Sequence, residues 1–556
     1  MSGAFAVLRR ALRGVSPQSD ERPEEAPKAR TFALHRVIVV LGFVVVVYVS
    51  LGSLALPQGP DQAIFAWAGD VILDGGVPYR SAWDIKGPLT YYIYAFAEGV
   101  FGRREISIRL LDFGIILCGC GLLRSVVLRL NGRNTFGANC AVICYCLLYY
   151  TGGYADTAQP EGWGALLMLA VVALLVIPDV WEPKATAAAG ALMACAALIK
   201  PTYLIYLSLP VVYIAATQAS CRHQLWVALR FFFLGFSLPL GLAVLVLLQT
   251  AALSDFIDVL RYLYTTYETV DRPSGLAALS ALPVSLFNTG ILSPLLFVPI
   301  GLREILNRKS GPVAISIATW LALAILTVII QAQYWQDHWL PAALATSTIF
   351  GAAMSDIGPQ TASRRTGPFG TTITLVLVIL ITIAPPGWRS LSRNVSWPAY
   401  VLGFQSEPDY IHQVTAPFNE VEEPYNYTVM RRLSNFIATH SQSNDQMVVW
   451  GWDVAVFNMS GRRSATRFGV FQPLIEDGPV KARYQRTFLR EFASNNPKYV
   501  VVDTRGGWFM SDDSGLKLLS GFPEFEHALH AHYRVLTVLD VYQVWIQSIP
   551  NQASKD

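Results

Sequence analysis

Long apolar segments recur along the first two thirds of this chain, and they constrain its fold more than any other feature. A helix needs about 20 mostly apolar residues to cross a bilayer. Candidate segments lie at 35–56, 107–129, 136–152, 163–178, 185–199, 201–217, 224–249, 288–305, 312–332, 338–355 and 369–386. Several are short, and region 185–217 can be divided otherwise. Because only 15% of the residues are charged, against about 25% in soluble domains, we predict an α-helical polytopic membrane protein with about eleven transmembrane helices.

Basic residues divide unequally between the short connections, which predicts the orientation. With the N-terminus inside, the inner connections contain Arg124, Arg129, Arg133, Lys184, Arg222, Arg303, Arg308, Lys309, Arg364 and Arg365. The outer connections contain Asp61, Asp84, Asp156, Glu161, Asp255, Asp258, Glu268, Asp271 and Asp337, with some basic residues among them. Residues 1–34 are then a cytoplasmic tail before an uncleaved first helix, and the C-terminus lies outside.

The composition changes near Trp388 to that of a soluble domain. The segment near 430 is amphipathic at helical spacing, those near 447 and 498 resemble buried strands, and the one near 534 resembles an edge or hairpin strand. We therefore predict a membrane core at 35–386, with a first outer loop at 57–106, and an extracytoplasmic α/β domain at 387–556.

Net charge and cysteine placement exclude some classes of function. The formal net charge is only +3, which gives no reason to expect a nucleic-acid partner. All seven cysteines lie in or beside apolar segments, so neither a disulfide scaffold nor a thiolate metal site is indicated.

The first outer loop begins with Asp61, ahead of an apolar helical run. An aspartate here has two interpretations, which are compatible with each other. One is the N-cap of the helix, where it accepts hydrogen bonds from the first free amides. The other is a general base at the membrane boundary.

Two lysines indicate an anionic ligand. Asp84 and Lys86 precede Gly87-Pro88 and an aromatic helix that suits the membrane interface. A lysine at that depth suits a phosphate, although Lys86 alone is more simply a snorkelling side chain. Lys200 lies between two apolar segments, where an ionisable residue is costly and faces a cavity, a partner or a charged substrate. Together the lysines favour an anion presented from the membrane, such as a lipid phosphate.

Further candidates lie in the other outer connections, and each is equally well explained as ordinary surface or interfacial chemistry. Asp156 and Glu161 stand in a short loop close to the membrane face, where solvated charge is the simple interpretation. Tyr334 and His338 stand at a helix mouth, beside tryptophans typical of an interfacial belt. Arg261 and Arg272 belong to an amphipathic outer segment and are candidate phosphate or sugar contacts.

This pattern resembles the glycosyltransferase C family of polytopic membrane enzymes, in the branch of lipid A aminoarabinose transferases, rhizobial galacturonosyltransferases and protein O-mannosyltransferases. The resemblance covers about residues 35–355 and is carried by DQAIFAWAGDVILDGGVPY with Asp61, WDIKGPLTYYIYAFAEGVFG with Lys86, REISIRLLDF with Arg109, the loop acids Asp156 and Glu161, and LIKPTYL with Lys200. It implies that Asp61 is the catalytic carboxylate and that both lysines contact the donor phosphate.

Two positions depart from the family pattern. The acidic pair of the mannosyltransferases is Asp61-Gln62 here, so Gln62 cannot serve as a second carboxylate. The doubled proline of the aminoarabinose transferases is Gly87-Pro88, which leaves the sugar open.

The resemblance implies a hexosyl- or pentosyltransferase in the bacterial inner membrane, with its C-terminal domain in the periplasm. It would move a sugar from a polyprenyl-phosphate donor to an envelope glycan, glycolipid or protein, with Asp61 as base, donor phosphate contacts from Lys86, Lys200, Arg261 and Arg272, and substrate contacts from Asp84, Asp156, Glu161, Tyr334 and His338. Neither a metal nor a cofactor is expected, and membrane lipids are its other partners. A transporter of a lipid-linked anion, or a non-catalytic assembly protein, are the alternatives. The transporter is less favoured, since we see no internal duplication.

Overall fold

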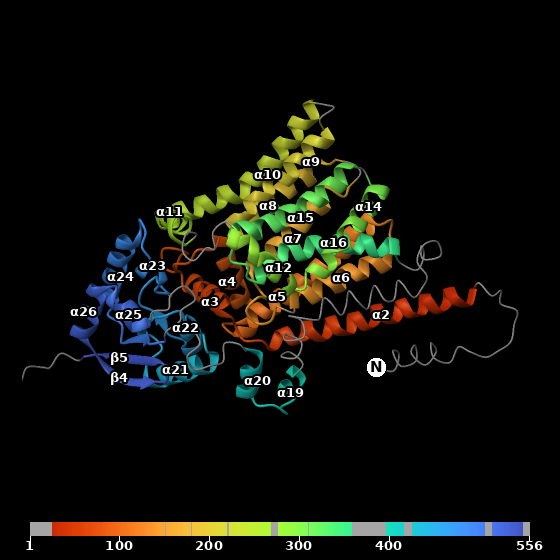
Figure 1. The fold of residues 1–556 in the computed structure, drawn as a ribbon. Coiled ribbons are helices and arrows are strands. Elements are labelled where there is room, and N and C mark those ends of the chain that lie inside the picture. The colour runs from red at the N-terminus through yellow and green to blue at the C-terminus, as the bar shows by residue number, and fades with distance from the viewer. Residues whose placement is uncertain are drawn as a thin grey trace, which may run out of the picture.

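The computed structural model describes residues 25–150, 152–178, 181–218, 222–267, 276–309, 311–357, 396–415, 425–505 and 514–548. The N-terminal two thirds form a bundle of helices, and the last part forms a smaller domain around a sheet (Figure 1). Predictions that fall on 1–24 and 358–395, including the segment 369–386, lie outside the described residues. The boundary at 386 and 387 therefore stays a prediction.

The helices of the bundle overlap the other ten predicted segments. They are α2 (Glu25–Gly52), α5 (Glu105–Leu130), α6 (Thr135–Tyr150), α7 (Pro160–Leu175), α8 (Pro183–Ile199), α9 (Ser208–Gln218), α10 (Arg222–Gln249), α12 (Leu276–Asn288), α13 (Leu292–Leu295), α14 (Val298–Arg308), α15 (Gly311–Gln331) and α16 (Leu340–Ile357). Short helices join them at η1 (Ser53–Ala55), η2 (Pro201–Leu207), η3 (Leu263–Tyr267) and η4 (Asp337–Trp339), and α11 (Leu253–Tyr262) follows α10. Helix α2 begins inside the predicted tail.

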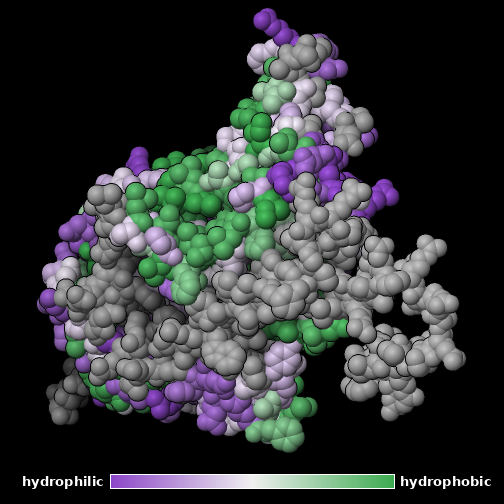
Figure 2. Space-filling view, turned by 45° about the vertical axis from the view of Figure 1, so that its right-hand side comes forward, coloured by the Kyte–Doolittle hydropathy of each residue, from purple (hydrophilic) through white to green (hydrophobic). Residues whose placement is uncertain are grey.

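By length and composition, three of the described helices could cross a membrane: α5, α10 and α15. Residues 39–55 and α3 (Pro60–Leu73) pass the same test as one span bent by 56°. Helices α6, α7 and α8 are apolar but have only 16 or 17 residues, which is close to the lower limit for a span. Figure 2 shows the resulting hydrophobic surface over the helical part of the molecule, with hydrophilic residues at the far tip and over the smaller domain.

The first outer loop contains two helices, α3 (Pro60–Leu73) and α4 (Pro88–Phe101). Each begins with a proline at its first position, where the missing N–H costs nothing and the fixed φ suits a helix. The helices pack closely, since the rings of Phe65 and Tyr94 have centroids 5.5 Å apart. The loop is thus an ordered helical hairpin.

The C-terminal domain contains a five-stranded sheet in the order β2-β1-β3-β5-β4. Its elements are α19 (Trp397–Val401), α20 (Glu407–Val414), α21 (Tyr427–His440), β1 (Gln446–Trp450), α22 (Ala455–Ser460), β2 (Arg463–Ser464), α23 (Gln472–Ile475), α24 (Lys481–Asn495), β3 (Tyr499–Asp503), α25 (Gly515–Ser520), α26 (Pro523–His532), β4 (Tyr533–Leu539) and β5 (Tyr542–Gln547). Strand β1 pairs in parallel with β2 and β3, whereas β5 is antiparallel to β3 and β4.

The predicted elements of this domain are confirmed. The amphipathic segment near 430 is α21, the two apolar segments are the central strands β1 and β3, and the segment near 534 is the β4–β5 hairpin with β4 at the edge. All five residues of β3 are buried, as the continuous apolar run YVVVD predicts for a central strand.

The C-terminal domain packs directly on the first outer loop. The N–H of Trp83 donates to the carbonyl oxygen of Arg467 at 2.7 Å, and Asn458 donates to the carbonyl oxygen of Ala63 at 3.1 Å. The rings of Trp67 and Phe457 stack with centroids 6.0 Å apart. One buried apolar cluster therefore includes residues of both segments, and the loop is held between the helical bundle and the sheet domain.

Candidate active site

Asp61 stands in the first turn of α3, but it does not cap the helix. The N-cap residue is Gly59, whose N–H donates to Oε1 of Gln62 at 2.9 Å. The amide of Gln62 also donates to the carbonyl oxygens of Tyr154 and Thr157, in the connection between α6 and α7 that we call the second outer loop. The side chain of Gln62, not that of Asp61, therefore caps the start of the helix. The prediction that Asp61 is the N-cap is wrong.

Arg109 extends this network beneath the loop. Its guanidinium is buried and donates to Oε1 of Gln62 at 2.6 Å and to the hydroxyl of Thr157 at 2.7 Å. It also donates to the carbonyl oxygen of Pro57. Gln62 and Arg109 therefore fix the start of α3 against the second outer loop and leave the Asp61 carboxylate, whose side chain is 42% exposed, open to a substrate.

Hydrogen bonds to the backbone fix the position of Lys86. Its carbonyl oxygen accepts hydrogen bonds from the hydroxyls of Tyr79 at 2.9 Å and Tyr91 at 3.1 Å. The next residue, Gly87, donates its N–H to the carbonyl oxygen of Ile199 at 3.0 Å. That carbonyl is available because α8 ends there, so the lysine loop docks on the end of α8.

Lys200 follows α8 directly and precedes Pro201, whose ring and missing N–H prevent the α-helix from continuing. Its ammonium group donates to Oε1 of Gln331 at 2.7 Å and to Oε1 of Glu161. The side chain is only 10% exposed. The break between α8 and η2 therefore places a buried cation beside the end of α15.

Glu161, in the first turn of α7, joins the two lysines. Its Oε1 atom contacts the ammonium of Lys200 and lies 3.6 Å from the ammonium of Lys86. Lys86 in turn lies 3.6 Å from Oδ2 of Asp61. The chain thus brings together one buried and one partly buried cation, one buried carboxylate and one open carboxylate, from α3, α7, the Lys86 loop and the end of α8.

The neighbouring carboxylates favour the charged form of Lys86. Burial alone would lower its pKa, but Glu161, Asp61 and Asp337 together hold the pKa above its ordinary value. Burial raises the pKa of Asp156 to about 7, and the charges of Asp61 and Glu161 act in the same direction. These shifts favour a charged Lys86 ammonium and reduce the number of charged carboxylates around it.

Asp84 lies behind the lysine loop. It is buried, and the Tyr91 hydroxyl donates to its Oδ2 atom at 2.8 Å. Burial raises the pKa of Asp84 to about 6, against the opposing effects of the Ile85 N–H and the Lys86 charge. Asp84 supports the loop through Tyr91, which also binds the Lys86 carbonyl.

His338 joins the cluster, whereas Arg261 does not. Nε2 of His338 lies 4.0 Å from Oε1 of Glu161. Arg261 is 64% exposed on α11 and has an ion pair with Asp258 at 3.9 Å. The backbone carbonyl of Tyr334 accepts a long hydrogen bond from Ser285 at 3.4 Å. Arg272 lies outside the described residues.

Sequence reasoning did not select Gln331 or Asp337 as site residues. Gln331 holds the Lys200 ammonium, and Asp337 is buried, with a pKa raised by burial and by Glu161 and Asp156. Both lie at the junction between α15 and η4, beside the predicted His338. A buried polar side chain at the end of an apolar helix is the signal that could have identified them.

One group of side chains has the composition of a cation site. Ligand atoms of Glu161, Asp337 and His338 lie within 4.8 Å of one another, and all three residues are buried. However, the Glu161 oxygen nearest to the lysines already accepts a hydrogen bond from the Lys200 ammonium. The arrangement thus offers ligands for a divalent cation but places a positive charge beside them.

Comparisons with known proteins rest on structure alone. No protein-family model matches the sequence, and no curated protein matches it. The structure of ArnT from Cupriavidus metallidurans bound to undecaprenyl phosphate is similar, with a TM-score of 0.57, 14% sequence identity, and coverage of 92% of this chain and 98% of that chain. The apo state of the same protein gives a TM-score of 0.54 at 14% identity, covering 91% and 97%.

These similarities confirm the fold predicted from the sequence. The chain shares the overall fold of ArnT, a bundle of long apolar helices followed by a C-terminal α/β domain. At 14% identity the likeness concerns the fold, so the activity must be argued from the side chains.

Proposed function

We propose that this protein is a membrane glycosyltransferase that uses a polyprenyl-phosphate sugar as donor. The observation that carries the proposal is the pairing of a half-exposed carboxylate, Asp61, with the Lys86 ammonium at 3.6 Å, beside the buried lysine Lys200. An acid open to solvent and two cations shielded from it are what transfer of a sugar from a phosphate requires: a base for the acceptor and charge stabilisation for the leaving group.

The two lysines would bind the donor phosphate. Both ammonium groups converge on the same Glu161 oxygen, so an incoming phosphate would meet both cations at one point. ArnT, which shares the fold, was crystallised with undecaprenyl phosphate, and this supports a polyprenyl phosphate as the ligand. Arg261 is a weaker candidate because its side chain points to solvent.

The reaction would be a single displacement. The acceptor hydroxyl attacks the anomeric carbon, the bond from that carbon to the phosphate oxygen breaks, and its electron pair stays on the phosphate. Asp61 takes the acceptor proton. The donor phosphodiester thereby becomes a phosphate monoester with one more negative charge, which Lys86 and Lys200 stabilise in the transition state. The products are a glycosylated acceptor and polyprenyl phosphate.

The lysines also support catalysis without a metal ion. Lys200 donates to Oε1 of Glu161, so a divalent cation bound by Glu161, Asp337 and His338 would lie beside the positive charge of Lys200. The proposal therefore predicts that transfer continues in the presence of EDTA. A loss of transfer on EDTA treatment that Mg²⁺ or Mn²⁺ restores would show instead that Glu161, Asp337 and His338 bind a required metal.

The sugar would be a hexosyl or pentosyl group, and the acceptor an envelope glycan, glycolipid or protein outside the bacterial inner membrane. The N-terminus would be cytoplasmic and the C-terminal domain periplasmic, as the basic residues of the short connections indicate. Asp156, Glu161, Asp84 and His338 would shape the substrate site, whereas a direct substrate contact from Tyr334 or Arg272 rests on the sequence pattern alone.

The decisive experiment compares cell-envelope glycans by mass spectrometry in cells with and without the protein, and then in cells that express variants. A sugar should be missing without the protein and restored by the wild type. Asp61→Asn should fail to restore it, while Asp477→Asn, at a carboxylate that is 98% exposed and pairs with Lys481, should restore it fully. Full restoration by a folded, membrane-inserted Asp61→Asn protein would exclude Asp61 as the base.

The two alternative functions predict different results, which the Asp61→Asn variant and an assay in vesicles distinguish. A non-catalytic assembly protein would tolerate Asp61→Asn. A transporter would deliver labelled lipid-linked substrate across a vesicle membrane without forming a glycosylated product. Detection of the product with purified protein in vesicles therefore separates the enzyme from both.

A further inference from the structure

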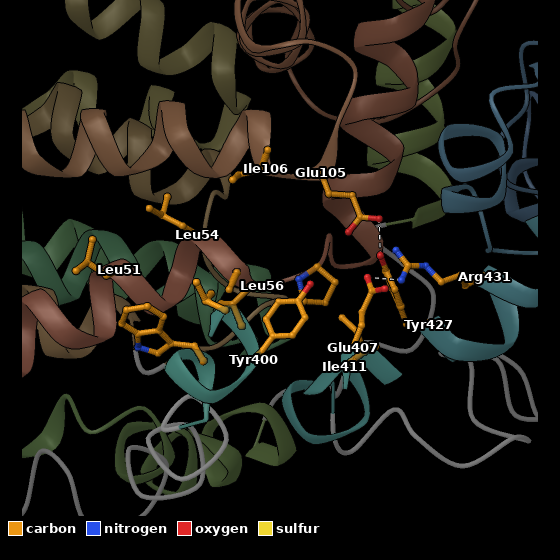
Figure 3. Close-up of a pocket in the computed structure, with 14 residues that line it drawn as sticks. Leu51, Leu54, Leu56, Glu105, Ile106, Tyr400, Glu407, Ile411, Tyr427 and Arg431 are labelled. Carbon is orange, nitrogen blue, oxygen red and sulfur yellow. Dashed lines mark hydrogen bonds and ion pairs between the residues drawn. The ribbon is translucent and has the colours of Figure 1, made fainter. Parts of the chain in front are cut away.

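A cavity lies beside the segment that leads into α3, apart from the candidate active site. It has a volume of about 450 Å³ and lies between the end of α2, the start of α5 and the helices α19–α21 (Figure 3). Its lining includes neither Asp61, Lys86 nor Lys200. This size is within the range of small-molecule sites, and the cavity is separate from the candidate active site.

One end of the cavity is apolar and continues from a membrane helix. Leu51 and Leu54 lie at the end of α2 and in η1, and Trp397 and Val401 come from α19. The indole of Trp397 packs on Gly52, where a Cβ atom would lie 2.8 Å from Cδ1 of the ring. The close approach of α19 to α2 therefore depends on this glycine.

The other end is polar and has a net negative charge. Figure 3 shows Glu105, Tyr427, Glu407 and Arg431 together, away from Leu51 and Leu54. The Tyr427 hydroxyl donates to Glu105, and Arg431 pairs with Glu407. Two carboxylates and one guanidinium leave one negative charge in excess, which favours a ligand with a cationic group over an anionic one.

The surroundings indicate access from the lipid phase. Val401, Leu402 and Phe404 are 61%, 68% and 84% exposed, an unusual display for three nearby apolar residues in water. They lie beside the end of α2, whose residues 39–55 belong to a candidate membrane span. Such residues next to a membrane helix suit contact with the bilayer interface.

We propose that this cavity binds a membrane phospholipid with a primary amine headgroup, of the phosphatidylethanolamine type. The ammonium group would lie between Glu105 and Glu407, the lipid phosphate would face Arg431, and the upper part of an acyl chain would lie against Leu51, Leu54 and Trp397. The proposal rests on the cavity alone and does not depend on the glycosyltransferase activity.

The position of the cavity gives the lipid a structural effect. Leu56 and Pro57 line the cavity, and the Pro57 carbonyl accepts a hydrogen bond from Arg109. Gly59, the N-cap of α3, lies two residues further on, and its carbonyl accepts a hydrogen bond from Tyr425 at 3.0 Å. A bound lipid would therefore support the segment that positions the start of α3.

The test uses the purified full chain and native mass spectrometry with phosphatidylethanolamine, phosphatidylglycerol and phosphatidylcholine of the same acyl composition. Wild-type protein should retain phosphatidylethanolamine at least tenfold better than phosphatidylglycerol. Leu54→Trp, which fills the apolar end, and Glu105→Gln, which removes a carboxylate but keeps an acceptor for Tyr427, should each reduce that preference about tenfold.

The matched control is Leu245→Trp on α10, where the leucine is 49% exposed on an apolar helix outside the cavity lining. It should bind lipid as the wild type does. Equal retention of all three lipids by the wild type would overturn the proposal, as would an unchanged preference in both cavity variants. Should Leu54→Trp fail to fold, Val401→Trp tests the same end, because Val401 is largely exposed and tolerates a larger side chain.

Discussion

The N–H of Gly87 donates to the carbonyl oxygen of Ile199 at 3.0 Å, and this one hydrogen bond joins the Lys86 loop to the end of α8. The approach is possible only for glycine, because a Cβ atom at position 87 would lie 2.1 Å from the carbonyl oxygen of Leu198. The two lysines of the candidate site thus come together through a backbone contact.

Gly87→Ala should therefore separate Lys86 from Lys200. The clash is with backbone, which cannot turn aside as a side chain can, so the loop must move. A displacement of about 1 Å in such a site can cost about 100-fold in rate, and we expect a loss of transfer of that order. The control is Gly114→Ala in α5, where an added Cβ meets no atom within 4 Å. Activity of Gly87→Ala within a few fold of the control would contradict this account.

Glu161→Gln tests whether the buried carboxylate holds the two lysines together. The variant keeps a hydrogen-bond acceptor for Lys200 but leaves two ammonium groups close to each other without the shared negative charge. Uncompensated buried charge costs about 3–5 kcal/mol, so the melting temperature should fall. Added undecaprenyl phosphate should raise the melting temperature of the variant more than that of the wild type. Equal shifts for the two proteins would indicate that the phosphate binds elsewhere.

Gln62→Leu should destabilise the protein without touching a catalytic group. The change removes the bonds of Gln62 with Gly59, Tyr154, Thr157 and Arg109. Each buried partner left unsatisfied costs about 1–3 kcal/mol, and we expect a total of about 3 kcal/mol or more in the free energy of unfolding. Gln62→Glu keeps an acceptor oxygen for Gly59 and Arg109 but places its second oxygen against the carbonyls of Tyr154 and Thr157, so it should destabilise the protein as well. A melting temperature of Gln62→Leu equal to that of the wild type would refute this assignment.

Asp84 should make stability depend on pH. Its pKa is raised to about 6 by burial, whereas an unfolded aspartate has a pKa of about 4. The folded protein therefore binds the proton more tightly, and the stability that Asp84 contributes is present below about pH 4 and is lost as the pH rises through about 6. Above pH 7 the loss is about 3 kcal/mol.

Asp84→Asn removes this titration and keeps an acceptor for Tyr91. Its melting temperature relative to the wild type should rise between pH 4 and pH 7 and then level off. The same pH dependence of the melting temperature in both proteins would show that folding does not raise the pKa of Asp84.

The sequence pointed to the centre of the candidate site because a few charged residues stand among apolar or aromatic neighbours. Lys200 is a charged residue between apolar segments, and Asp61 and Lys86 are charges at helix starts in an aromatic loop, so each stands out from its neighbours. Glu161 was selected only as a loop charge, because its contact with Lys200 spans 39 positions and no periodicity encodes it. The contact between Lys200 and Gln331 spans 131 positions and was missed for the same reason.

Sequence patterns locate a residue but not its partners. An amphipathic pattern locates the polar face of α11 but does not say what that face meets, so phosphate binding by Arg261, which is 64% exposed, stays a prediction. Asp61 and Gln62 are both suitable partners for a helix start, and only the position of the second outer loop determines which one is used. The strands β1 and β3 were predictable from their apolar runs, but their order in the sheet depends on long-range pairing.

The packing of the C-terminal domain on the first outer loop has a consequence for how the protein is made. Asn458 and the Ala63 carbonyl that it contacts are 395 positions apart, so most of the chain is synthesised between them. Until then the faces of Trp67 and Trp83 that meet Phe457 and Phe468 have no cover. The sheet domain that covers this hairpin is therefore synthesised last, and a chain interrupted before it leaves these aromatic faces uncovered.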